Sequence, residues 1–421
     1  MKIQKITFRD VQLTLGLVLL GLVFIAGLLV LNWWAAKSYG KGEDLLSAWN
    51  GARAFLFENI DPYTRTVAER TQVLYYGRVV REGEFPFALD IPFPLMVPLL
   101  PLGFISDFAW ARAVWMTLSE LGLMLLSVFA LRLADWRPSR WFTILLLVFS
   151  LTWFFSVTSI LNGSFSAILV LALVGALLAM RDFNDELAGF LLALSAMKWE
   201  ITLLLWMLII IGAYSSRRWR VFAGMGMTWI VVGAIGFLLY PDWIWAYMRA
   251  VAANWRAADV LSLRIIFEQW IPGYGASLAL LVAGLLLLIL ILEWFVALRG
   301  RDFRRVAWVA ALAIAITPLV GPSNTYANLV PLVFPIAFML PFVWERWAKY
   351  PYVVITLLIS LFYFLPLILQ LPSLATQIPA DGLTFLLPPV LTLICLYWIR
   401  WTLVRPPRTW LDGVKRELKK Q

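Results

Sequence analysis

Two adjacent carboxylates, Glu43 and Asp44, are the residues of this sequence best placed for acid–base chemistry. The chain contains no histidine and one cysteine, Cys395, so the side chain that most often titrates near neutral pH is missing. A general base must therefore be Asp or Glu. We predict that Asp44 is the catalytic base and that Glu43 belongs to the same substrate pocket. The alternative is that Asp44 only caps a helix, as Asp does before an amphipathic stretch.

Three cations are candidates for binding a phosphate group. Lys198 falls between two short apolar runs, where a charged side chain is costly and indicates function. Its alternative role is an ion pair with Glu200, either at a turn or within one tilted helix. Arg256 and Arg264 lie in a polar stretch, where guanidinium groups could hold a phosphate through paired hydrogen bonds. The alternative for these two arginines is a solvated surface helix.

Other polar residues at predicted turns and helix ends are candidates for lining the substrate pocket. Polar residues at such places are usual, so each is a weak signal when taken alone. With Glu43 and Glu200, the candidates are Asp61, Tyr63, Asn162, Asn324 and Asn328. We predict no metal site and no cofactor, because the sequence has no cluster of metal ligands and no phosphate-binding glycine loop.

The elements that position these residues are predicted to be membrane-spanning helices. The chain is 62% hydrophobic and 14% charged, with a mean hydropathy of +0.83, which is typical of a polytopic membrane protein. Its apolar runs are too long for barrel strands. We predict an all-α bundle of about twelve transmembrane helices, at residues 11–34, 108–134, 141–161, 164–180, 187–197, 200–214, 221–240, 276–298, 306–320, 329–344, 352–369 and 384–404.

The distribution of Lys and Arg sets the predicted orientation, because these residues collect in cytoplasmic loops. It indicates cytoplasmic N- and C-termini, one transmembrane domain over residues 1–404 and a basic tail at 405–421. The tail is most simply attracted to anionic lipid. Residues 35–107 then form a large extracytoplasmic loop with its own helices. The collection of Lys and Arg in cytoplasmic loops also explains the net charge of +10. We therefore exclude nucleic acid as a partner.

Within the loop, the sequence IPFPLMVPLLPLGF at 91–104 predicts a membrane-surface or re-entrant element, because four prolines break a straight span. Two isolated acids lie inside predicted spans. Glu293 is expected to reach toward Arg299 near a helix end. No role is assigned to Glu120.

These segments together resemble glycosyltransferase family 87, the polyprenyl-phosphate-mannose-dependent α-mannosyltransferases of the multi-spanning GT-C class. The likeness covers about residues 40–345. It rests on Asp44 after the first span, on the Asp61-Pro62-Tyr63 turn, and on the proline-rich 91–104 stretch followed by the sequence ARAVW. Gly163 matches a Gly-Gln pattern of the family and Lys198 matches its lysine. Ser262-Leu263 match the end of a further pattern.

The resemblance implies an inverting transfer of a sugar, expected to be mannose, from a polyprenyl-phosphate donor to a lipid or glycan acceptor. Asp44 would be the base on the extracytoplasmic face of the plasma membrane, and membrane lipids would be further partners. The chain departs from the family pattern at a late loop, where Asn324-Thr325-Tyr326-Ala327-Asn328 replaces a segment with histidine. A lipid or lipid-linked-sugar transporter and a family member without activity remain the alternatives.

Overall fold

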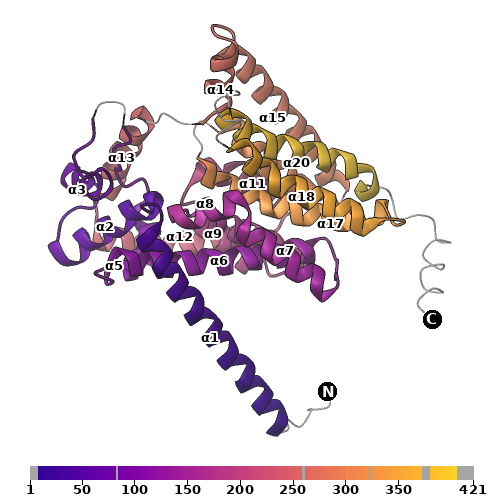
Figure 1. Ribbon diagram of the computed structural model, residues 1–421. Coiled ribbons are helices and arrows are strands. Elements are labelled where there is room, and N and C mark those ends of the chain that lie inside the picture. The colour runs from indigo at the N-terminus through magenta and orange to yellow at the C-terminus, as the bar shows by residue number, and fades with distance from the viewer. Residues whose placement is uncertain are drawn as a thin grey trace. The chain divides into compact units, whose positions relative to one another are not determined.

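Helices make up most of the described part of the chain. A computed structural model describes residues 8–81, 84–257, 261–300, 302–321, 325–371 and 380–404 (Figure 1). Within these ranges every regular element is a helix, so the predicted all-α fold of a polytopic membrane protein is confirmed. The C-terminal tail at 405–421 lies outside the described residues.

Eight helices of the described part are long and apolar enough to cross a membrane. A ninth span is formed if α7 (Arg140–Thr152) and α8 (Phe154–Asn162), which meet at a bend of 53°, are taken together. The other three predicted spans fall on α9 (Ser166–Arg181), α10 (Asp185–Ser195) and α11 (Trp199–Ser215). These helices are shorter than the roughly 20 residues of a perpendicular span. Each of the twelve predicted spans therefore corresponds to helix, and the structure finds eight or nine of full length.

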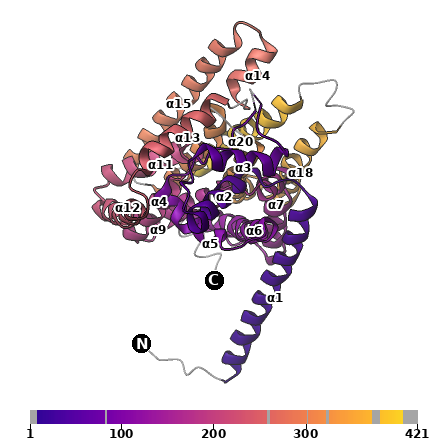
Figure 2. The ribbon, with the colours of Figure 1, turned by 90° about the vertical axis from the view of Figure 1, so that its left-hand side faces the viewer.

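The chain divides into two compact units, and the first contains the predicted loop. This unit takes the described residues of Met1–Leu121, Ile160–Phe165 and Tyr240–Ala257. Figure 2 shows α2 and α3 of this unit lying side by side. Its helices are α1 (Phe8–Ser38), α2 (Glu43–Glu58), α3 (Arg65–Tyr76), α4 (Phe93–Met96), η1 (Val97–Leu99), α5 (Leu100–Gly103), the first part of α6 (Phe108–Leu133) and α13 (Trp243–Ala257).

The second unit holds most of the apolar helices. It comprises Gly122–Ser159, Ser166–Leu239 and the described residues from 261 onward. Besides α7 and α9–α11 it contains α12 (Trp219–Leu239), α14 (Leu263–Trp270), α15 (Gly275–Gly300), α16 (Phe303–Val320), η2 (Tyr326–Leu332), α17 (Val333–Arg346), α18 (Pro351–Leu369) and α20 (Ala380–Val404).

Two expectations about helix breaks are confirmed. The proline-rich stretch at 91–104 forms three short helical pieces, α4, η1 and α5, instead of one continuous helix. The two short apolar runs around Lys198 are separate helices, because α10 ends at Ser195 and α11 begins at Trp199. The alternative of one tilted helix through this region is therefore wrong.

A hydrogen bond network joins α1 to α6 inside the first unit. The Asn32 amide donates to Thr117 Oγ1 at 3.0 Å and to Glu120 Oε2 at 2.9 Å. Such polar contacts hold neighbouring helices together where water is scarce. Glu120, to which no role was assigned from its position in the sequence, thus accepts a hydrogen bond from another helix.

In the second unit, two glycines allow α10 and α12 to pack with their backbones almost in contact. A Cβ atom at Gly189 would lie 2.1 Å from the Val221 carbonyl oxygen, and one at Gly224 would lie 2.4 Å from the Glu186 carbonyl oxygen. Small residues permit this close approach between helices in a membrane. Any larger side chain at these positions must push the two helices apart.

We expect Gly224→Leu to lower the free energy of unfolding by about 2 kcal/mol or more, because the side chain has no space against α10. Thermal unfolding of the purified protein in detergent would measure the loss. Gly226→Leu is the matched control, since it lies in the same helix and a Cβ there meets no atom within 4 Å. Equal melting temperatures for the two variants would contradict the close packing.

Candidate functional site

Asp44 lies in the first turn of α2, where it is half-buried. The helix begins at Glu43. The N-cap residue before it is Gly42, which has a left-handed backbone with φ of 67° and no side chain that could cap the helix. Gly42, and not Asp44, therefore occupies the N-cap position of α2. A carboxylate in the first turn lies at the positive end of the helix dipole, which stabilises its negative charge.

Arg112 in α6 fixes the chain that leads into α2. Its side chain is buried, and it donates hydrogen bonds to four backbone carbonyl groups. The acceptors are Ala36 at 3.0 Å, Tyr39 at 2.8 Å, Gly40 at 3.1 Å and Leu161 at 3.0 Å. A Cβ at Gly42 would lie 2.8 Å from Arg112 Cδ. The arginine thus occupies the space that a glycine leaves two residues before Asp44.

The turn at Asn162-Gly163 also contacts the start of α2. Gly163 has a φ of +68°, and a Cβ there would lie 2.7 Å from the Cβ of Leu45. Leu45 follows Asp44 directly, so the turn lies against the first turn of α2. Asn162, a predicted pocket residue, is half-buried beside this contact. The structure therefore brings two predicted site residues, Asp44 and Asn162, into one small region of the first unit.

Glu43 is turned toward α3. It accepts a short hydrogen bond from the Tyr75 hydroxyl, and Lys41 Nζ donates to the Tyr75 carbonyl oxygen. Burial and this hydrogen bond raise the pKa of Tyr75 above its ordinary value. Because one Glu43 oxygen accepts a hydrogen bond from the half-buried Tyr75, Glu43 has a structural contact that explains its presence beside Asp44.

Asp61 and Tyr63 hold the turn after α2 in place. Asp61 accepts hydrogen bonds from the Tyr63 backbone N–H and from the Tyr240 hydroxyl, each at 2.8 Å. The Tyr63 hydroxyl donates to the Ile91 carbonyl oxygen at 2.6 Å. Burial is the main cause that raises the pKa of both tyrosines. The polar groups of Asp61 and Tyr63, two predicted pocket residues, are therefore used in contacts that stabilise the fold.

Asn254 in α13 is a buried polar residue that the sequence reasoning missed. Its Nδ2 donates to the Ala88 carbonyl oxygen at 2.7 Å, and its Oδ1 accepts from the Ala88 N–H at 3.2 Å. The side-chain amide thus satisfies both backbone groups of one residue, as a neighbouring strand would. Arg256 lies two residues further along α13, but its side chain is outside the described residues.

In the second unit, Lys198 and Glu200 lie at the break between α10 and α11. Lys198 is the residue before α11 and has an extended backbone, with φ of −129°, and Glu200 is in the first turn of α11. Both side chains are half-buried. The Thr202 hydroxyl donates to the Lys198 carbonyl oxygen at 3.0 Å, which steadies the start of the helix.

The remaining predicted residues of the second unit are in two places. Arg264 is exposed in α14. Close to it in sequence, Glu268 accepts from the backbone N–H groups of Gly273 and Ala276, which lowers the pKa of Glu268. Asn328 in η2 accepts a hydrogen bond from the Ser166 hydroxyl at 3.0 Å. Asn324 lies outside the described residues.

Clusters of potential metal ligands were sought among the described residues. No group of three or more Asp, Glu or Cys side chains there is placed to hold a metal ion. In the first unit the candidate is one carboxylate, Asp44, at a tightly fixed helix start. In the second unit, taken by itself, the candidate is Lys198 at the break before α11.

The fold and these residues define an integral membrane protein with polar groups collected at helix starts and breaks. A family model, glycosyltransferase family 87, matches residues 92–322, which is more than half of the chain. The protein belongs to this family and is a membrane glycosyltransferase, with a sugar donor and an acceptor as its substrates. The match includes Arg112, Gly163 and Lys198 but begins after Asp44. Comparisons with curated proteins and with solved structures gave no match.

We expect Arg112→Gln to lower the stability of the first unit by about 3 kcal/mol, since it removes the buried donor of several backbone carbonyl groups. Arg112→Lys should rescue little, because a lysine cannot reproduce the planar fork of donors. Thermal unfolding in detergent, with Arg65→Gln as an exposed control on α3, would measure the effect. A melting temperature for Arg112→Gln as high as that of the control would show that the carbonyl groups find other partners.

Gly163→Ala and Gly77→Ala form a pair that separates backbone strain from a clash. Both glycines have a positive φ, 68° and 75°, but only Gly163 faces Leu45, whereas a Cβ at Gly77 meets nothing within 4 Å. Gly77→Ala should cost about 1 kcal/mol for the left-handed backbone alone. Gly163→Ala should cost about 2 kcal/mol more through overpacking. Equal costs in thermal unfolding would argue against contact between the turn and α2.

Proposed function

We propose that the protein transfers a sugar, mannose by family resemblance, from a polyprenyl-phosphate donor to a hydroxyl of a lipid or glycan acceptor. The transfer takes place on the extracytoplasmic side of the plasma membrane, with both termini in the cytoplasm. The acceptor oxygen forms a bond to the anomeric carbon as the bond from that carbon to the phosphate oxygen breaks. The acceptor proton goes to the Asp44 carboxylate, and the polyprenyl phosphate leaves with the electron pair. The configuration at the anomeric carbon is inverted.

The observation that carries this proposal is the way the chain holds Asp44. Arg112, Gly42 and Gly163 fix the backbone immediately before and beside the first turn of α2. A general base contributes most when its position relative to the reacting hydroxyl is fixed before the substrate binds. In a glycosyltransferase with no histidine, a rigidly held carboxylate is the group suited to this task. Glu43, the neighbouring carboxylate, is directed toward α3 by the hydrogen bond that it accepts from the Tyr75 hydroxyl.

The leaving group needs positive charge. Negative charge grows on the phosphate as the glycosidic bond breaks, so preorganised cations lower the barrier. Lys198 is our candidate for this role, because it occupies a helix break, where a lysine can project from the apolar part of a helix bundle. Arg256 and Arg264 are the further candidates from the sequence. The proposed step is a nucleophilic displacement at the anomeric carbon, with a proton passing from the acceptor oxygen to Asp44, so no atom changes its oxidation state.

Two other functions remain as outcomes of the test below. A carrier of lipid-linked sugars would also use many spans and an anion site, and a family member without activity would keep the fold alone. The chain lacks the late-loop histidine of the family pattern, and Tyr326 and Asn328 of the corresponding segment instead make contacts within the second unit. Tyr326 donates to Asp381 at 2.9 Å, so this segment is stabilised without a histidine.

We expect Asp44→Asn to lower the rate of sugar transfer by about 100-fold or more, since it removes the base. The donor should still bind, because the asparagine keeps the size of the side chain and the start of α2 is held by Arg112. Transfer would be measured with protein in nanodiscs, using radiolabelled polyprenyl-phosphate-mannose and an acceptor extract. Donor binding would be measured separately by equilibrium filtration.

Glu43→Gln is the matched control, and it should lower the rate far less than Asp44→Asn. If Asp44→Asn keeps the wild-type rate while Glu43→Gln loses it, Glu43 is the base and our assignment is wrong. Donor binding by the wild type with neither transfer nor translocation would indicate a member without activity. Movement of the intact donor between leaflets, without transfer, would indicate a carrier.

A further inference from the structure

An ion cluster of Glu293, Arg305 and Arg400 lies inside the second unit, where three long helices meet. Arg400 of α20 is 2.7 Å from a Glu293 oxygen of α15, and Arg305 of α16 is 3.8 Å from the other. The expected partner of Glu293, Arg299, instead lies over the Phe295 ring at 4.0 Å. The expectation of a local Glu293–Arg299 contact is therefore wrong, because the chain supplies two arginines from other helices.

The ion cluster carries more positive than negative charge. One carboxylate faces two guanidinium groups, and the three side chains are between 12% and 28% exposed. The Nε–H groups of Arg305 and Arg400 are buried and have no hydrogen bond partner among the described residues. The nearby Asp302 binds the Arg304 backbone N–H as a helix cap. A partly buried, uncompensated cation is costly, so the cluster has the character of a site for an added anion.

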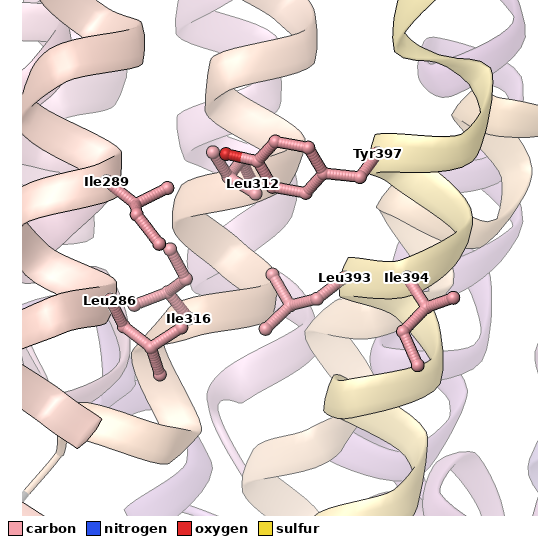
Figure 3. A pocket seen from close by; sticks show the side chains of 7 residues that line it. All are labelled: Leu286, Ile289, Leu312, Ile316, Leu393, Ile394 and Tyr397. Carbon is pink, nitrogen blue, oxygen red and sulfur yellow. The ribbon is translucent and has the colours of Figure 1, made fainter.

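An apolar groove lies between the same three helices. Its volume is about 370 Å³, within the range of small-molecule pockets. Figure 3 shows its walls, with the Tyr397 ring reaching from α20 toward Leu312 of α16. The lining residues are Leu286 and Ile289 of α15, Leu312 and Ile316 of α16, and Leu393, Ile394 and Tyr397 of α20.

The groove and the ion cluster are parts of one surface. Glu293 is one helical turn beyond Ile289, Arg305 two turns before Leu312, and Arg400 about one turn beyond Tyr397, so each charge lies on the groove face of its helix. All three charges lie toward the end of the groove where α15 is connected to α16. Trp308 links the two parts, because its ring is 5.6 Å from the Tyr397 ring and 5.8 Å from the Arg400 guanidinium carbon.

We propose that this surface binds one anionic phospholipid, with its phosphate at Arg305 and Arg400 and one acyl chain in the groove. A groove walled by six aliphatic side chains and the Tyr397 ring offers little for a polar ligand to bond, whereas an acyl chain fills it with apolar contact. The excess positive charge at one end selects a negatively charged headgroup over a zwitterionic one, as basic pockets between transmembrane helices do.

The spacing of the parts fits a lipid lying along the helices. From Glu293 to Leu286 the helix rises by about 10 Å, at about 1.5 Å per residue, so phosphate and chain can bind at the same time. Leu286, Ile289 and Ile394 leave part of their surface exposed, which keeps the groove open to the bilayer. The lipid would therefore enter sideways, without passing through the protein.

The inference is independent of the sugar transfer and can be tested on binding alone. Protein would be extracted from nanodiscs of phosphatidylcholine with a minor share of phosphatidylglycerol, and retained lipid counted by native mass spectrometry. A phosphatidylglycerol with a photoreactive acyl chain would then locate the contact. We expect phosphatidylglycerol to be retained in preference to phosphatidylcholine and to crosslink to peptides of α15, α16 and α20.

Arg400→Gln should weaken the retention of phosphatidylglycerol by about fivefold, the effect of one cation near anionic lipid. Arg299→Gln is the matched control, because it removes the same charge from a residue of α15 that lies outside the cluster. It should leave the retention of phosphatidylglycerol unchanged. Ile394→Trp fills the groove from an exposed position and should abolish the acyl-chain crosslink. Leu292→Trp, exposed on α15 outside the groove, should leave it intact.

Three results would overturn the proposal. Equal retention of phosphatidylcholine would show that the cluster does not select charge. Equal losses for Arg299→Gln and Arg400→Gln would assign the effect to general surface charge. Full displacement of phosphatidylglycerol by an equal amount of uncharged polyprenol would show that the groove serves an isoprenoid chain and that the arginines bind no headgroup.

Discussion

The contact between Arg112 and the backbone around it is the constraint on which the first unit depends. A helix leaves its last carbonyl groups without partners, and those at the end of α1 lie within reach of Arg112. Arg112 supplies donors to the carbonyl groups of Ala36, Tyr39 and Gly40, and its charge is balanced by these dipoles instead of by a carboxylate. The same side chain reaches Leu161, so the end of α1, the start of α2 and the turn at Gly163 share one centre.

The helices were predictable because hydropathy follows the requirement that backbone groups in lipid be satisfied internally. Each predicted span lies on a helix, and the prolines of 91–104 and the charged junction at Lys198 indicated real breaks. Membrane-crossing lengths were less predictable, since α10 and α11 are apolar helices of 11 and 17 residues, shorter than a full span. The close packing at Gly189 and Gly224 has no signature in hydropathy, because it depends on which helix faces which.

The candidate site was predictable in its residue types but not in its contacts. The absence of histidine directs attention to Asp44, and the structure places that residue one position inside the helix instead of at its cap. No local pattern reveals that Glu43 bonds Tyr75 from the next helix, or that Glu293 pairs with Arg400 of a helix more than a hundred residues away. The expectation that Glu293 would contact Arg299, a cation close to it in sequence, was wrong for this reason.

The pairing of Asn254 with Ala88 has a consequence for how the two positions can vary. The Asn254 amide bonds only to backbone atoms of Ala88, so many side chains could replace that alanine without changing the hydrogen bonds. At position 254 even an aspartate would lose the donor. The two positions of this contact are thus restricted differently. Related sequences should vary freely in residue type at position 88 and should mostly keep asparagine at position 254.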